Sequence, residues 1–139
     1  MPPPFTVYKK REREKRMTVN EIIAQVDRLR PNNIDRLQKI KYLSSVDKYI
    51  HQNIIKPRAG GEEVACPEYG EHDGGAVLLA PSPYDELYLY FLEAKIYYET
   101  REIKKYANSM AMYNQTMSEY MAWYFRDHAQ RENVIPRYY

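Results

Sequence analysis

Apolar residues recur every three or four positions along two stretches in the first half of the chain. This spacing places side chains on one face of a helix. The first stretch covers residues 19–30, and Thr18 with Glu21 ahead of it forms a capping-box pattern that predicts a clean helix start. The second covers residues 34–54 and should end before Pro57. The pattern therefore predicts two amphipathic helices that pack as a hairpin.

The second half of the chain predicts a long central helix followed by a last helix. Residues 82–85 have the cap and first-turn proline of a helix start, and we expect the helix to run to about Tyr106. Its first four turns are apolar nearly all round, so we expect neighbouring subunits to cover what one small domain cannot. The phase shifts near residues 107–109, and the last helix should run to about His128. Trp123 lies off its apolar stripe and is an interface candidate.

Residues 57–82 separate the two helical halves and contain all five glycines. Connections of this length are usually functional or ordered by a partner. Residues 64–66 and 76–80 have the composition of short strands, so the insert is expected to be either a loop or a hairpin. The predicted fold class is all-α: a small helical bundle with a long central helix and a long loop or short β-hairpin insert.

The length of 139 residues fits one domain, which we divide into three parts. Residues 1–16 form a basic N-terminal extension, residues 17–128 the helical domain, and residues 129–139 a C-terminal tail. The extension is interpreted either as an optional segment or as a phosphate-binding arm. One cysteine excludes an intramolecular disulfide, and no apolar run is long enough to cross a membrane. The 15 tyrosines suit surfaces that become buried on association.

Charge is segregated along the sequence. Residues 1–58 hold 14 Lys and Arg against 6 Asp and Glu, whereas residues 59–93 hold 8 acids and no Lys or Arg. The acidic segment is interpreted either as a solvated loop or as a surface that meets a basic surface on a neighbouring subunit, which would build a ring or a filament. The expected contact joins Glu62, Glu63, Glu68 and Glu71 to bases among Arg28, Arg36, Lys39, Lys41 and Lys48, with Tyr90, Tyr97 and Trp123 as further candidate interface residues.

Catalytic chemistry is not indicated. The sequence has no glycine-rich phosphate loop and no convergent nucleophile and base. Cys66, Glu68, His72 and Asp73 lie close together, but a structural zinc site normally needs paired Cys or His ligands. We therefore expect no catalytic, cofactor-binding or metal-binding residue, and we do not expect an enzyme.

Two blocks of residues resemble the small head–tail connector, or adaptor, proteins of long-tailed bacteriophages and prophages. The first block is Thr18-Val-Asn-Glu21, Val26-Asp27-x-Leu29-x-Pro31-Asn32 and Lys39-Ile-x-x-Leu43-Ser-x-x-Asp47. The second is Leu78-Leu79-Ala-Pro-x-Pro-Tyr84-Asp85-x-Leu-Tyr88, Tyr90-x-Leu92-Glu93-Ala-Lys95-Ile96, Glu102-Ile-x-x-Tyr106 and Met112-Tyr-Asn114. The resemblance covers about residues 18–128.

The resemblance implies a structural virion protein. Such proteins form a ring of about twelve subunits beneath the portal, bridge it to the stopper or tail, and leave a channel through which DNA passes without sequence-specific binding. It also implies a portal contact in the C-terminal tail, at Arg131, Ile135, Arg137, Tyr138 and Tyr139; a frayed terminus is the alternative. The expected location is the virion, with assembly in the host cytoplasm and no membrane contact. The alternative function is a small DNA-binding or regulatory helical protein that uses the basic N-terminal segment.

Overall fold

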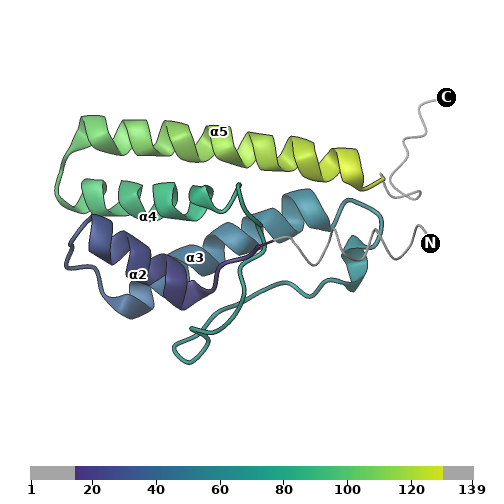
Figure 1. Ribbon diagram of the computed structural model, residues 1–139, viewed down its shortest axis with the longest axis horizontal. Coiled ribbons are helices and arrows are strands. Elements are labelled where there is room, and N and C mark those ends of the chain that lie inside the picture. Colours follow the sequence, from purple (N-terminus) through teal and green to yellow (C-terminus); the bar gives the residue numbers. More distant parts are fainter. Residues whose placement is uncertain (1–14, 130–139) are drawn as a thin grey trace.

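The computed structural model describes residues 15–129 and is helical in all its regular elements there (Figure 1). The helices are α2 (Val19–Leu29), α3 (Arg36–Ile50), α4 (Glu86–Glu99) and α5 (Ile103–Asp127), with a π-helical turn η1 (His51–Ile55) and a 3-10 turn η2 (Gly61–Glu63). The predicted all-α class is confirmed. Within residues 15–129 the insert is a loop, and its pairing is limited to an isolated bridge between Thr18 and Val77.

The capping box predicted at Thr18 is present. The Thr18 hydroxyl accepts a hydrogen bond from the Glu21 backbone at 3.1 Å, and the Thr18 backbone N–H donates to the Glu21 carboxylate at 2.9 Å. Since two otherwise unpaired amides are satisfied in this way, α2 begins at Val19. Its buried residues are Val19, Ile22, Ile23 and Val26, which belong to the predicted apolar stripe.

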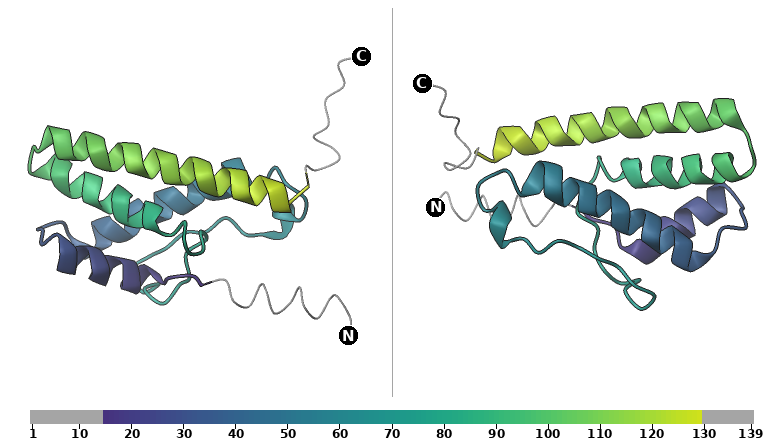
Figure 2. Two further views of the ribbon diagram at one scale, coloured as in Figure 1. Left: turned by 45° about the horizontal axis from the view of Figure 1, so that its top comes forward. Right: turned by 180° about the vertical axis from the view of Figure 1, so that it is seen from behind.

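The helices form three layers. Figures 1 and 2 show α4 lying between α5 on one side and the α2 and α3 pair on the other. The central helix is therefore covered on two sides by its own chain, which supplies much of the burial that the sequence pattern assigned to neighbouring subunits. Its buried side chains are Leu87, Tyr88, Leu92, Ala94 and Ile96.

The α4 helix ends at Glu99, earlier than the expected end near Tyr106. Arg101 has φ 62°, in the left-handed region, and the turn around it reverses the chain into α5. The backbone N–H of Glu102 donates to the Tyr97 carbonyl at 2.9 Å and satisfies part of the helix end. The longest helix is consequently α5, with 25 residues, packed along α4.

The long loop is held from inside by one buried carboxylate. Asp47 of α3 accepts hydrogen bonds from the Tyr69 and Tyr88 hydroxyls, each at 2.5 Å, and from the Leu79 backbone at 3.1 Å. Burial raises the pKa of Asp47, although the hydrogen bonds from these groups act in the opposite direction. The loop is thus ordered by contacts within the chain, whereas its length alone indicated a functional segment or one ordered by a partner.

None of the helices in the described part combines the length and the apolar character needed to cross a membrane.

Candidate interaction surface

Two edges of α4 remain at the molecular surface. Glu86, Tyr90, Glu93 and Tyr97 follow one another at intervals of three or four residues and form one stripe. Phe91, Lys95 and Tyr98 form a second stripe. At 3.6 residues per turn the centres of the two stripes lie about 140° apart around the helix. We call the first stripe with its surroundings the groove edge, and the second the aromatic edge.

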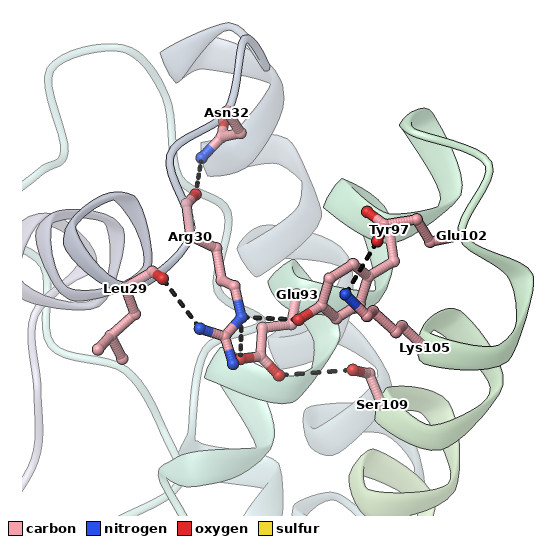
Figure 3. Close-up of polar contacts among 8 residues, drawn as sticks. All are labelled: Leu29, Arg30, Asn32, Glu93, Tyr97, Glu102, Lys105 and Ser109. Atoms are coloured by element: carbon pink, nitrogen blue, oxygen red, sulfur yellow. Dashed lines mark hydrogen bonds and ion pairs between the residues drawn. The ribbon is translucent and has the colours of Figure 1, made fainter.

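The groove edge borders a groove of about 610 Å³ between the end of α2, α4 and α5. Figure 3 shows the Arg30 guanidinium reaching across it to α4. Arg30 Nε donates to the Tyr97 hydroxyl at 2.7 Å and lies 3.3 Å from Glu93 Oε2. The Glu93 side chain is 17% exposed and also accepts from the Ser109 hydroxyl at 3.4 Å. The charges of Arg30 and Glu93 therefore balance each other at the base of the groove. The groove is lined by Arg30, Tyr90, Glu93, Tyr97, Lys105, Asn108, Ser109 and Met112.

The rim of the groove edge carries an acid that has no balancing cation among residues 15–129. Lys105 lies 3.0 Å from Glu102 and is neutralised there. Glu86, in contrast, is exposed and accepts from the Tyr90 hydroxyl at 3.3 Å, and among residues 15–129 no basic side chain is within ion-pair distance of it. Desolvation raises the pKa of Tyr90, and the nearby carboxylates of Glu86 and Glu93 raise it further. Of these two acids, Glu93 is paired with Arg30, so Glu86 is the one whose charge is not balanced among residues 15–129.

The aromatic edge is a connected row of rings around one lysine. Phe91 lies at its centre, with ring centroids 6.1 Å from Tyr42 of α3 and 5.0 Å from Tyr113 of α5. The Lys95 ammonium lies 4.9 Å from the Phe91 centroid and 5.1 Å from that of Tyr42. These are cation–π distances. Tyr98 is 63% exposed. The edge therefore presents a half-buried cation and apolar area to solvent.

The rings continue along this side of the molecule. Tyr98 contacts Tyr106 at a centroid distance of 5.6 Å. Tyr49 of α3 is 46% exposed. The pKa of Tyr113 is raised to about 12, mainly by burial and further by Tyr49 and Asp47, so Tyr49 lies close to the same row. Rings from three helices thus contribute to one surface, whose amphipathic tyrosines are typical of protein interfaces.

The acids predicted to form an intersubunit contact all lie on the surface of the insert. Glu62 and Glu63 are in η2, while Glu68 and Glu71 are in the loop that follows. All four are exposed. Glu68 lies 3.9 Å from Lys48 of the same chain, and Glu71 lies 3.8 Å from His72.

The predicted basic partners have different environments. Lys39 is buried, its side chain is 6% exposed, and its ammonium lies 2.6 Å from the Asp27 carboxylate. It is therefore already engaged within the chain. Arg36 donates to the side chain of Asn20, and Lys41 is exposed on α3. Arg28 is also exposed.

The aromatic candidates divide between the groove and an internal cluster. Tyr90 and Tyr97 line the groove. Trp123 is half-buried against Tyr84 and Tyr120, with centroid distances of 5.4 and 5.9 Å. The portal-contact residues in 131–139 and nearly all of the basic extension lie outside the described residues.

Arg30 and Lys95 were not predicted as site residues, and the structure places Arg30 at the base of the groove and Lys95 over the rings of the aromatic edge. For Lys95 a signal was available: residues 86–98 contain two interleaved stripes at helical spacing, one with glutamates and one with a lysine. For Arg30 there was none, because its position follows from how α2 packs on α4.

Metal-binding chemistry has no assembled site in the described part. Across residues 15–129 no three His, Cys, Asp or Glu side chains come together in a way that could hold a metal ion. Cys66 is a free, exposed thiol. Comparisons of the chain with models of protein families, with curated proteins and with solved structures found no match.

Proposed function

We propose that this chain is a structural adaptor that forms a ring of about twelve subunits at the head–tail junction of a long-tailed bacteriophage or prophage. In this role it bridges the portal to the stopper or tail around the DNA channel. It acts by binding and not by catalysis, and it uses no cofactor. The resemblance of residues 18–128 to connector proteins supports the proposal at the level of sequence.

The observation that carries the proposal is the environment of α4. A central helix that packs between two layers of its own chain still has two edges at the surface, and these edges are unlike. A closed ring requires each subunit to contact its neighbours through two different surfaces. The groove edge and the aromatic edge supply two such surfaces in each copy.

The overall charge is consistent with a DNA channel. The formal net charge is +2. The affinity of a protein for DNA rises with the number of phosphates that it neutralises. A nearly neutral subunit is therefore expected to bind DNA weakly, so that DNA can slide through the channel. The proposed partners are other copies of the chain, the portal, and the stopper or tail-completion protein, within the virion.

Native mass spectrometry across a range of concentrations tests the proposal. We expect a closed species near twelve subunits. A monomer at every concentration would contradict a self-assembling ring. A discrete dimer that binds duplex DNA with a steep salt dependence would instead support the alternative of a small DNA-binding protein.

A further inference from the structure

We propose that the aromatic edge of one copy docks on the groove edge of the next, and that Lys95 of the first copy pairs with Glu86 of the second. This inference rests on the proposed ring and names its subunit contact. We propose it as the main interface in place of the contact between the acidic insert and the bases of α2 and α3. Two of those bases, Lys39 and Lys48, lie within ion-pair distance of acids of the same chain.

Among residues 15–129, the neighbours of the Lys95 ammonium are aromatic rings, and no acid balances its charge. It is half-buried over the rings of Phe91 and Tyr42, and in residues 15–129 no carboxylate lies within ion-pair distance of its ammonium. A cation that is partly desolvated by aromatic rings gains when an anion completes its surroundings. The aromatic edge therefore fits a partner surface with an acid near exposed aromatic groups.

The groove edge has this chemistry. Glu86 is exposed at the start of α4 and has no cation partner in the described part, whereas Glu93 on the same stripe is paired with Arg30. Tyr90 lies beside Glu86, and Tyr97 and Met112 line the adjoining groove. Exposed tyrosines of the aromatic edge, Tyr98 above all, have a concave surface to enter that combines aromatic rings with polar side chains able to hydrogen-bond a tyrosine hydroxyl.

The signs of the charges favour contact between unlike edges. If two aromatic edges met, Lys95 of one subunit would face Lys95 of the other. If two groove edges met, Glu86 of one subunit would face Glu86 of the other. Like charges facing each other across an interface cost several kcal/mol. Contact between unlike edges removes this repulsion. If α4 runs parallel to the ring axis, edges about 140° apart also make successive copies curve, so that the assembly closes.

Charge reversal tests the pairing. We expect Lys95→Glu and Glu86→Lys each to raise the concentration needed for assembly at least about tenfold, since losing one partner of an interfacial charge pair typically costs more than 1.4 kcal/mol. An equimolar mixture of the two variants should recover assembly in rings with equal numbers of each, because every contact then joins opposite charges. Impaired folding of either variant would not produce this recovery, and circular dichroism of each variant checks the fold directly.

Lys41→Glu is the matched control, because it makes the same change of charge on α3 outside both edges. We expect it to leave assembly unchanged. Assembly that survives Lys95→Glu but fails in Lys41→Glu would overturn the inference in favour of the acidic insert as the contact. If the wild type assembles and Lys95→Glu and Glu86→Lys assemble equally well, the edge contact is refuted but the ring is not. If the wild type never assembles, the proposed ring itself is refuted.

Discussion

The hydrogen bonds around Asp47 make a quantitative test of what orders the long loop. Tyr69→Phe and Tyr88→Phe each remove one hydroxyl that donates to the Asp47 carboxylate at 2.5 Å. The two hydroxyls are not equivalent. The Tyr88 hydroxyl also accepts from the backbone N–H of Ala80 at 2.8 Å, inside the core. Tyr88→Phe therefore affects two hydrogen bonds, one to a charged group and one from a buried amide.

The expected cost follows from these partners. A hydrogen bond to a charged group contributes about 1.5–3 kcal/mol to stability, and a buried polar group left without a partner costs about 1–3 kcal/mol. We therefore expect Tyr69→Phe to lower the free energy of unfolding by about 2 kcal/mol and Tyr88→Phe to lower it by about 4 kcal/mol. Both changes keep the aromatic ring, so the loss of buried apolar area is small.

Urea unfolding followed by far-ultraviolet circular dichroism measures these differences, with all variants at one protein concentration because assembly stabilises the folded state. The decisive result is which of the two variants loses more free energy of unfolding. If Tyr69→Phe were as destabilising as Tyr88→Phe, the bond from Ala80 would contribute nothing. If neither variant lost more than about 0.5 kcal/mol, the carboxylate would not be what holds the loop.

Three further predictions concern single positions. Because burial raises the pKa of Asp47 above its ordinary 3.8, the Asp47 carboxyl group binds its proton more tightly in the folded chain than in the unfolded chain. The stability of the wild type relative to Asp47→Asn should therefore be greatest below pH 3.8 and fall as pH rises through the folded pKa, as a series of urea midpoints would reveal. Gly61→Ala would place a methyl group in overlap with the Ile55 carbonyl oxygen, and we expect a loss of about 3 kcal/mol in thermal unfolding; unchanged melting would contradict the close approach. Thr18→Ala should cost about 1 kcal/mol in urea unfolding, because the Glu21 backbone N–H loses its acceptor. Ser45→Ala is the control, since the Ser45 hydroxyl donates to the Tyr42 carbonyl within α3, and an equal loss there would show that the effect is not specific to the cap.

The start of α2 and the buried stripes could be predicted because each depends on neighbouring residues. The helix start predicted at residues 82–85 was wrong, because these residues form turns and α4 begins at Glu86. Thr18 and Glu21 determine the start of α2 through bonds within one turn. The break between α4 and α5 could not be predicted in the same way. It occurs at residues 100–102, which include neither glycine nor proline, and it requires Arg101 to adopt a left-handed conformation that this residue rarely takes. The packing of α5 on α4 determines this turn.

The loop contact at Asp47 gave a signal that sequence reasoning did not use. Asp47 lies on the buried face of α3 together with Leu43 and Ile50. An acid within an apolar stripe requires hydrogen-bond donors, because burying a carboxylate without them is costly. The identity of those donors was not predictable, since Tyr69 and Tyr88 lie 22 and 41 residues further along the chain.

The two roles of α4 are separable because they use different faces of one helix. Tyr88 points into the core, whereas Lys95 lies about 10 Å further along the helix and near the surface. Effects at sites this far apart with no shared partner usually add within about 0.5 kcal/mol. A chain with both Tyr88→Phe and Lys95→Glu should therefore combine the stability loss of the first with the assembly defect of the second. An assembly defect in Tyr88→Phe alone, measured where that variant is fully folded, would mean that the Asp47 contacts also set the position of the edges.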